Sequence, residues 1–330
     1  QSCRPGTLIM KVALTGVSGY LGQLILPLLD KHEGVESILG LDIAPCPFHS
    51  PKCSFETADM RFADFKGMLK GIDILYHLAF VVEPPKGMTV ETIDEINIQG
   101  SKNVLKGAVA AGVSKLIVAS SIAAYGAHPD NPEVLTETSP LRPNADWYYS
   151  RAKGEIEAFL DALQGQHPET TIIRFRPSTF LGPTIRNPMG RQYLSRSLMG
   201  LKKGYRVDHC WDEDVAEAFV LALSCENSDT FNLAGENPIT LDDAGRLLGK
   251  KVVYLNQGLV SFAVRIAAAL GLAPPGLRDW VDVPTRGSIL VSANKAKVEL
   301  GWKPRFDSAG ALLEFARQKG ILSGKKVQNQ

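Results

Sequence analysis

The sequence predicts an α/β fold: a Rossmann-type doubly wound parallel sheet with a smaller, interleaved C-terminal substrate lobe. Three observations predict it. Runs of Val, Ile and Leu, as strands buried on both faces require, alternate with helix-period segments through the first half of the chain. A glycine-rich turn joins the first of these runs to the first helix. After about residue 177 the rhythm breaks into short pieces rich in Pro and Gly, which is typical of a second, loop-rich lobe.

The elements follow from this pattern in chain order. Buried strands are expected over the apolar runs 8–14, 37–41, 72–78, 116–119 and 171–175. Helical spacing predicts helices over 20–31, 94–111 and 149–163, and later over 212–224, 295–300 and 309–319. Residues 259–273 read as a buried or half-buried helix that ends at Pro274 and Pro275. Strand, helix and strand at this spacing form βαβ units and therefore a parallel sheet.

Composition narrows the class of protein. Lys and Arg number 36 against 35 Asp and Glu, a net charge of +1, so nucleic acid is not an expected partner. No run reaches the roughly 18 apolar residues of a membrane helix, and no membrane partner is expected. Residues 1–9 lack the apolar core of a signal peptide and read as an upstream extension or a remnant of cloning.

The five cysteines indicate a reducing compartment, and hence a cytoplasmic protein. They include no C-x-x-C pair and have no histidine at ligand spacing, so we expect free thiols and no metal site. A loop disulfide between Cys46 and Cys53 is the alternative.

The turn after the first strand predicts a dinucleotide site. Gly16, Gly19 and Gly22 have the spacing G-x-x-G-x-x-G between an apolar strand and a helix. The first glycine permits the tight turn, the second lets backbone approach a pyrophosphate, and the third lets the helix pack on the strand. The helix then begins at Tyr20 and Leu21 with free N–H groups facing the anion. A plain strand–helix turn is the alternative.

Asp42 selects the cofactor. It ends the second strand about twenty residues after the glycines, where an acid bonds the adenosine ribose hydroxyls. A carboxylate there repels a 2′-phosphate, and neither Ile43 nor Ala44 supplies a positive charge, so NAD is predicted rather than NADP. A solvated turn aspartate is the alternative.

From these features we assign residues 10–177 to an NAD-binding Rossmann domain and 178–330 mainly to a substrate-binding lobe, with some segments returning to the Rossmann domain.

A tyrosine and a lysine four residues apart predict acid/base chemistry. Tyr149 and Lys153 lie on one face of a helix, where the ammonium stabilises the phenolate. Ser121 ends a buried strand, and ligands bind at the carboxyl ends of strands in an open parallel sheet. Ser121 is then placed to hydrogen-bond the substrate oxygen whose proton Tyr149 takes or returns. The alternative is that the serine caps a strand end and the tyrosine fills a groove.

With these residues together, the chain resembles the extended short-chain dehydrogenase/reductase family and, within it, the NAD-dependent epimerase/dehydratase branch. The resemblance covers Met10 to about Lys319. Residues 59–61 resemble the family's motif D-x-R. Residues 77–80 resemble its motif H-x-A-A, except that Phe80 replaces the last alanine. Residues 120–126 match its motif S-S-x-x-x-Y-G. Asn97 matches an asparagine of the long helix, and 176–177, 182–183, 213–216 and 300–304 match later landmarks.

The resemblance implies a set of site residues and a homodimer. Two copies would pair through helices 94–111 and 149–163, although packing on the protomer's own sheet explains the same apolar faces. The implied catalytic residues are Ser121, Tyr149, Lys153 and Asn97. To the glycine loop and Asp42 the resemblance adds the cofactor-binding residues Asp59, Met60, Leu78, Ala79, Tyr149, Lys153 and Pro177. The candidate substrate residues are Tyr125, Thr179, Arg186, Arg191 and Trp211, with Arg206 as a further candidate for an anion.

Departures from the family's motifs reduce the number of reactions that we expect. Ile122 and Ala123 stand where dehydratases and decarboxylases carry acids, so neither reaction is expected. Thr179 stands where sugar-nucleotide enzymes usually have asparagine, and Trp211 where many have histidine.

Three functions remain open. The first is an NAD-dependent epimerase-like oxidoreductase acting on a sugar or sugar nucleotide, with Tyr149 as acid/base. The second is an NAD(P)-dependent alcohol dehydrogenase or carbonyl reductase acting on another small molecule, which the apolar Phe180, Leu181, Trp211 and 259–273 would suit. The third is a non-catalytic NAD-binding sensor.

Overall fold

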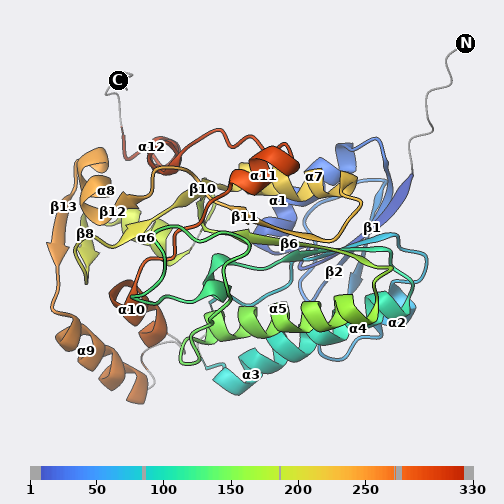
Figure 1. The fold of residues 1–330 in the computed structure, drawn as a ribbon, viewed down its shortest axis with the longest axis horizontal. Coiled ribbons are helices and arrows are strands. Elements are labelled where there is room, and N and C mark those ends of the chain that lie inside the picture. Colours follow the sequence, from blue (N-terminus) through green and yellow to red (C-terminus); the bar gives the residue numbers. More distant parts are fainter. Residues whose placement is uncertain (1–8, 84–86, 186, 271, 273–276, 323–330) are drawn as a thin grey trace, which may run out of the picture.

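The computed structural model describes residues 9–83, 87–185, 187–270, 272 and 277–322. At its centre lies a seven-stranded, wholly parallel sheet (Figure 1). In spatial order its strands are β11 (Asp229–Leu233), β6 (Thr171–Pro177), β5 (Lys115–Ala119), β4 (Ile74–His77), β1 (Met10–Thr15), β2 (Val35–Asp42) and β3 (Cys53–Thr57). The predicted Rossmann-type fold is confirmed.

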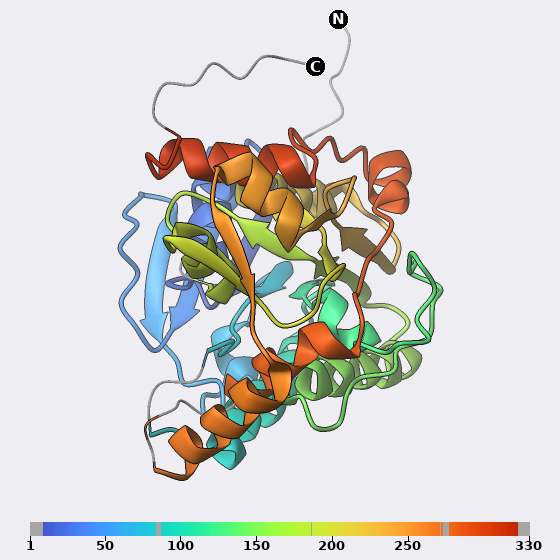
Figure 2. The ribbon, with the colours of Figure 1, turned by 90° about the vertical axis from the view of Figure 1, so that its left-hand side faces the viewer.

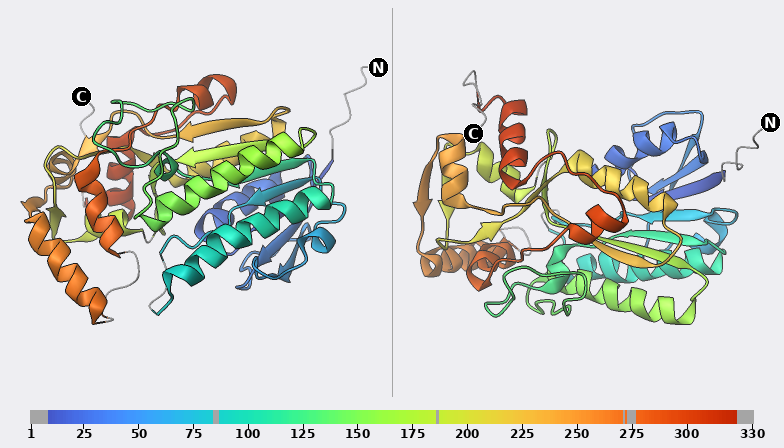
Figure 3. Two further views of the ribbon diagram at one scale, coloured as in Figure 1. Left: turned by 60° about the horizontal axis from the view of Figure 1, so that its bottom comes forward. Right: turned by 45° about the horizontal axis from the view of Figure 1, so that its top comes forward.

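Helices cover both faces of this sheet (Figures 1 and 3). One apolar layer joins the sheet to α1 (Tyr20–Lys31) and α7 (Asp212–Leu221) through side chains such as Leu26 and Phe219. The other layer joins it to α2 (Phe65–Met68), α4 (Ser101–Ala110) and α5 (Tyr148–Gln166) through side chains such as Leu105 and Leu160. Because the sheet is buried on both faces, the sequences of the predicted strands are runs of apolar residues.

The helix predicted over 94–111 is longer and changes its winding. It begins as α3 (Val90–Asp94), passes through the π-helical η1 (Glu95–Gly100) and continues as α4. A π-helical turn inside a longer helix is rare and often marks a functional position. Here it contains Asn97, one of the predicted catalytic residues.

The C-terminal lobe is built from short pieces around its own apolar core. Three two-stranded pairs join β10 (His209–Trp211) with β7 (Thr179–Leu181), β12 (Ile239–Thr240) with β9 (Arg206–Val207), and β13 (Lys251–Tyr254) with β8 (Ser197–Gly200). Side chains such as Leu181 and Phe315 form the core. The remaining elements are η2 (Ile122–Tyr125), α6 (Pro188–Leu194), η3 (Ala222–Ser224), α8 (Leu241–Leu248), α9 (Gln257–Ala269), α10 (Leu277–Arg286), α11 (Asn294–Glu299) and α12 (Ser308–Gln318).

Two strands of the central sheet were not predicted. β3 at one edge reads Cys-Ser-Phe-Glu-Thr and is largely exposed, so its sequence carries no apolar run. β11 at the other edge has only Phe231 and Leu233 as large apolar residues. Edge strands bury less surface than central ones, and their apolar pattern is correspondingly weak.

Three expectations concern surfaces and thiols. The four cysteines within the described ranges are free, including Cys46 and Cys53. No helix in the described part of the chain is long and apolar enough to cross a membrane. The large apolar side chains of α4 and α5 are buried or half-buried, which their own sheet explains, so the homodimer stays a prediction.

Candidate active site

The glycine loop has the geometry that a bound pyrophosphate requires. Gly16 has φ of +74°, and a Cβ there would lie 2.6 Å from the backbone nitrogen of Ala79. At Gly22 a Cβ would lie 2.4 Å from the carbonyl oxygen of Gly16, so only glycine lets α1 approach the loop this closely. Helix α1 starts without a capping side chain and without an acid in its first turn. Its first N–H groups can therefore bind an anion, and the loop fits a dinucleotide.

A single methyl group at Gly22 should test this fit. We expect Gly22→Ala to weaken NADH binding at least tenfold, because the clash displaces the first turn of α1 from the loop. Titration of NADH fluorescence gives the Kd. The matched control is Gly165→Ala in α5, where a Cβ would meet nothing within 4 Å. Equal affinity in both variants would contradict the assignment.

Asp42 is fixed beside the glycine loop at the end of β2. Its Oδ2 accepts a hydrogen bond from the backbone N–H of Ser18 at 3.1 Å, and its Oδ1 accepts one from that of Ala44 at 3.1 Å. Each oxygen keeps a lone pair for another donor. This carboxylate can therefore accept hydrogen bonds from the two ribose hydroxyls of the adenosine of NAD.

The other cofactor residues lie along the carboxyl edge of the sheet. Leu78 and Ala79 follow β4 directly, and Pro177 ends β6. Arg61 donates hydrogen bonds to Asp59 from its Nε, its Nη2 and its backbone N–H, and these bonds lower the pKa of that carboxyl. Met60 is buried against Gly100, where an added Cβ would lie 2.6 Å from the Cγ of Met60.

Tyr20 connects the glycine loop to the C-terminal lobe. Its ring stacks on Phe180 with centroids 6.0 Å apart, and its hydroxyl donates to the carboxylate of Asp212 at the start of α7. Burial and this carboxylate raise the pKa of Tyr20 far above its ordinary value. The hydroxyl of Tyr20 is thus engaged within the protein, and its backbone N–H lies in the first turn of α1.

The structure brings Tyr149, Ser121 and Lys153 together, as the sequence predicts. The hydroxyl of Tyr149 is hydrogen-bonded to the side chain of Ser121, which itself accepts the N–H of Ala123 at 3.1 Å. Burial raises the pKa of Tyr149, and the bond to Ser121 lowers it. The Nζ of Lys153 lies 5.9 Å from the centroid of the Tyr149 ring. The arrangement can hold a proton at the phenol oxygen and pass it to a neighbouring substrate oxygen.

Lys153 is held by two contacts that the sequence did not predict. Its Nζ donates to the carbonyl oxygen of Ala119 at 2.8 Å and lies 3.7 Å above the ring of Phe80. Phe80 is the residue that departs from the family's H-x-A-A, and its ring also meets Tyr149 edge-on at 5.5 Å. Burial lowers the pKa of Lys153 to about 7, while the charge of Glu157 opposes the shift.

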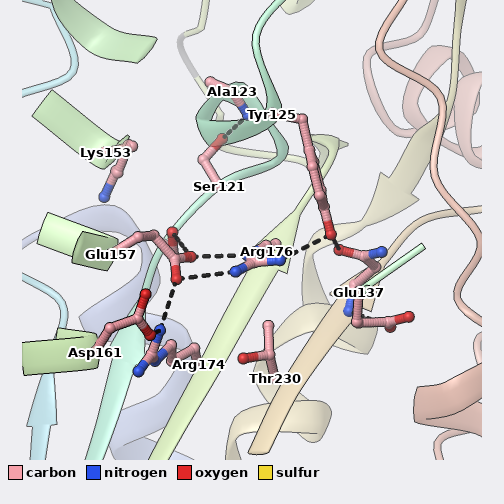
Figure 4. Close-up of polar contacts among 12 residues, drawn as sticks. Ser121, Ala123, Tyr125, Glu137, Lys153, Glu157, Asp161, Arg174, Arg176 and Thr230 are labelled. Atoms are coloured by element: carbon pink, nitrogen blue, oxygen red, sulfur yellow. Dashed lines mark hydrogen bonds and ion pairs between the residues drawn. The ribbon is translucent and has the colours of Figure 1, made fainter. Parts of the chain in front are cut away.

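Behind Lys153 lies a buried charge network (Figure 4). Glu157, one helical turn further along α5, accepts bonds from Arg176 Nε at 2.7 Å and Nη2 at 3.0 Å, from Arg174 Nη1 at 3.2 Å and from Ser120 Oγ at 2.6 Å. Sequence reasoning missed Glu157. The available signal was its spacing, K-x-x-x-E, which puts it on the same helix face as Lys153.

Tyr125 belongs to this network rather than to a substrate surface. The residue is 1% exposed. Its hydroxyl accepts from Arg176 Nη1 at 2.9 Å and lies 2.9 Å from Asn232 Oδ1 and 3.0 Å from the carbonyl oxygen of Thr136. All its hydrogen-bonding capacity is used inside the protein, so we no longer expect it to contact substrate.

The side chain of Asn97 is hydrogen-bonded to the backbone of Val81. Its Oδ1 accepts the N–H of Val81 at 2.8 Å, and its Nδ2 donates to the carbonyl oxygen of Val81 at 2.9 Å. The amide is fully buried. Asn97 therefore fixes the segment after β4 that carries Phe80, and we replace the predicted catalytic role with a positioning role.

Sequence comparison assigns the family. A model of the NAD dependent epimerase/dehydratase family matches residues 12–234, about two thirds of the chain. The chain belongs to this family. It is an NAD-dependent enzyme of the extended short-chain dehydrogenase/reductase type, which confirms the predicted cofactor and class of enzyme.

Similar proteins of this epimerase/dehydratase family differ in what they act on. The chain is 25% identical to the uncharacterized protein y4nG of Sinorhizobium fredii, over 94% of this chain and 78% of that protein. It is 25% identical to the decarboxylating sterol-4-alpha-carboxylate 3-dehydrogenase ERG26 of Candida albicans, over 91% of this chain and 94% of that protein. It is 26% identical to a 3-beta-hydroxysteroid dehydrogenase of Mycolicibacterium neoaurum, over 64% of this chain and 60% of that protein.

Solved structures show that the fold is shared with sugar-nucleotide enzymes. MoeE5 in complex with UDP-glucuronic acid and NAD matches with a TM-score of 0.71 at 21% identity, over 94% of this chain and 99% of that one. A UDP-N-acetylglucosamine 4-epimerase from Methanobrevibacter ruminantium matches with a TM-score of 0.73 at 18% identity, with the same coverage. At these identities the likeness concerns the fold.

The structure places the other substrate residues taken from the family resemblance in different surroundings. Trp211 is 2% exposed and packs edge-on against Phe306 in the core of the lobe, so it presents no surface to a ligand. Thr179 is half-buried at the start of β7. Arg191 bonds Glu83 at 2.9 Å. Arg186 lies outside the described residues.

Two buried histidines give this epimerase/dehydratase-family chain a defined acid sensitivity. His77 lies between Thr15 Oγ1 and Ser101 Oγ, at 2.7 and 2.8 Å, and burial lowers its pKa to about 3. His209 bonds the Tyr193 hydroxyl at 2.7 Å, and burial lowers its pKa to about 4. Both stay neutral in the folded chain where an unfolded histidine takes up a proton.

Each of these histidines should therefore lower the free energy of unfolding as the pH drops below about 6.5, whereas buried Asp208, whose pKa burial raises to about 7, acts in the opposite direction. The unfolded state binds more protons there, and each histidine should cost about 2 kcal/mol of stability at pH 5 relative to pH 8. Urea unfolding at several pH values measures this. His209→Gln should therefore lose about 2 kcal/mol less stability than the wild type between pH 8 and pH 5. A slope unchanged in His209→Gln would sink the assignment.

Proposed function

We propose that this chain is an NAD-dependent dehydrogenase that interconverts a secondary alcohol and its ketone on an apolar, steroid-like substrate. One observation carries the proposal. The two described arginines that would serve a nucleotide diphosphate, Arg191 and Arg206, are each paired with a carboxylate of the chain itself. Their partners are Glu83 at 2.9 Å and Glu133 at 3.2 Å. A diphosphate would have to displace these carboxylates.

The surroundings of Tyr149 support an apolar substrate. Its ring has Phe80 at 5.5 Å and Trp147 at 5.9 Å between centroids. Trp147 is part of an apolar cluster with Val283 of α10 and Ile289. Two relatives at 25% and 26% identity are named for action on sterols or steroids, which agrees with a wall of aromatic and aliphatic side chains.

The reaction needs no group beyond those already described. When bound, NAD+ supplies the acceptor for the hydride that leaves the carbinol carbon. Tyr149 takes the hydroxyl proton, Ser121 donates a hydrogen bond to the substrate oxygen, and the Lys153 ammonium stabilises the phenolate. The products are the ketone, NADH and one proton. Ile122 and Ala123 supply no second acid, so the chemistry ends at the ketone.

The experiment is a direct comparison of substrate classes. The purified chain is incubated with NAD+ and either dehydroepiandrosterone held in cyclodextrin, UDP-glucose or UDP-galactose, and absorbance at 340 nm is followed. We expect NADH formation with the steroid and none with the UDP-sugars. Interconversion of the two UDP-sugars without net NADH would instead establish an epimerase. Binding of NADH with no turnover of any substrate would favour a sensor.

Cofactor exchange gives a second readout. A dehydrogenase must exchange NAD for NADH at every turnover, whereas an epimerase regenerates its cofactor and gains by holding it. We therefore expect the purified chain to bind added NADH reversibly. Mass spectrometry of the denatured, never-supplemented protein should find well below one NAD per chain, and stoichiometric NAD would count against the dehydrogenase.

A further inference from the structure

Helix α9 carries a row of exposed apolar side chains, which we call the α9 stripe: Leu259, Phe262, Ile266 and Leu270, the last just beyond the helix end. Their exposed fractions are 69%, 62%, 46% and 67%, so the expectation of a buried or half-buried helix was wrong for this face. Their spacings of three, four and four residues place them on one face of a helix. Large apolar side chains this exposed, and this regularly spaced, mark an interaction surface.

The opposite face of α9 is already used by the fold. Ser261 Oγ donates to Asp282 Oδ1 of α10 at 3.0 Å, and Gln257 Nε2 donates to Thr285 Oγ1 at 2.9 Å. Leu259, Ile266 and Leu270 therefore lie on the side of α9 away from these contacts, and Phe262 lines the groove between α9 and α10. Figures 1 to 3 show α9 at the outer end of the C-terminal lobe, beyond β8 and β13.

Basic side chains lie beside the stripe. Arg265 is exposed and is the one charged residue of α9, which contains no acid. Lys202 reaches the same region, because its Nζ donates to the carbonyl oxygen of Thr285 at 3.3 Å. A groove of about 630 Å³ runs between α9 and α10 and is lined by Phe262, Arg265 and Arg286. The acid in this groove, Asp282, is bonded to Ser261. Apolar side chains flanked by basic ones match an anionic lipid surface.

A second copy of the chain is a poor occupant. A helix of 13 residues is about 20 Å long and about 10 Å wide, so its face offers on the order of 200 Å². A stable protein interface needs about 800 Å² from each partner. We propose that the α9 stripe docks on the surface of a lipid bilayer that contains anionic headgroups, with the apolar side chains inserted at the level of the headgroups.

Docking there would bring the bilayer close to the wall of the active site. Arg286 at the end of α10 forms two hydrogen bonds with Asp146, at 2.6 and 2.8 Å, just before α5 begins. Val283 of α10 packs in the cluster of Trp147 and Tyr149. A substrate dissolved in the membrane would then lie near the residues that convert it. The docking itself does not depend on the identity of the substrate, so it can stand if the steroid proposal fails.

Vesicle flotation tests the inference with the full chain. Vesicles of 70% phosphatidylcholine and 30% phosphatidylglycerol should carry the protein to the top of a density gradient, and vesicles of phosphatidylcholine alone should carry less. The variant Leu259→Ser/Phe262→Ser/Ile266→Ser should lose at least tenfold in partitioning. The matched control removes three exposed apolar side chains elsewhere, Val134→Ser/Met199→Ser/Val298→Ser, and should float as the wild type does.

Two further readouts keep the outcome decisive. NADH affinity should be the same in all three proteins, which excludes misfolding as the cause of lost flotation. Light scattering should show no change of oligomeric state in the stripe variant. Flotation equal in the stripe variant and the control would overturn the inference. A dimer that the stripe variant breaks would overturn it in favour of a second copy.

Discussion

Replacing Tyr149 by phenylalanine should lower kcat by about 10² to 10⁴-fold, the usual contribution of a positioned general acid/base. The phenol oxygen is hydrogen-bonded to Ser121 in the buried end of the site, and no other titratable side chain of the described chain is assigned to the substrate oxygen. Steady-state kinetics with whichever compound is turned over in the comparison of substrate classes, together with NADH titration, checks the result. NADH affinity should change little, because the ring and its contacts with Phe80 and Trp147 remain.

Tyr148→Phe is the matched control for this change. The two tyrosines are neighbours at the start of α5, but the hydroxyl of Tyr148 donates to the carbonyl oxygen of Val82 instead. Its removal should cost stability and leave kcat within a few-fold of the wild-type value. If Tyr149→Phe retained wild-type kcat, or if both variants lost activity equally, the acid/base assignment would be wrong.

The parts of the site that could be predicted are those fixed by local sequence. Gly16, Gly19 and Gly22 are needed where backbone approaches backbone, and Asp42 follows at the end of the next buried strand. Both features belong to short segments with a strong period. The pairing of Tyr149 with Lys153 is also local, because four residues is about one turn of a helix.

The parts that escaped prediction depend on segments far apart in the chain. Phe80 is one departure in a motif until the fold places its ring 3.7 Å from the Nζ of Lys153. Tyr125 follows a predicted strand and Trp211 precedes a predicted helix, and at both positions a substrate contact and a buried packing role look alike in sequence. Only the tertiary structure shows that both are buried.

Charge pairing is similarly invisible in the sequence. Arg191 and Arg206 were predicted as candidates for an anionic substrate, and their carboxylate partners are 108 and 73 residues away in the chain. Exposed pairs of this kind add little to stability. Their significance here is chemical, because they occupy the groups on which a sugar-nucleotide function would depend.

Glu157→Gln should be the most destabilising of the substitutions considered. Glu157 is fully buried, and the side chains of its partners Arg176 and Arg174 are 5% and 10% exposed. Removing the negative charge leaves Arg176 without a compensating charge in the interior, which costs about 3 to 5 kcal/mol in buried ion pairs. Urea unfolding at pH 7 measures the loss. The control Asp161→Asn removes the other, 68% exposed partner of Arg174 and should cost about 1 kcal/mol or less.

The same substitution should have a defined pH dependence. Burial alone would raise the pKa of Glu157, but bonds and charge from Arg176, with Ser120 and Arg174, hold it below the ordinary value. A depressed pKa gives stability that is present above the ordinary carboxyl pKa of about 4.3 and is lost as the pH falls through the folded-state value. The gap between wild type and Glu157→Gln should therefore be full at pH 7 and shrink only below about pH 4. A gap that closes already near pH 6 would mean that Glu157 is not ionised in the folded chain, and that its contacts hold the active-site helix by hydrogen bonding rather than by charge.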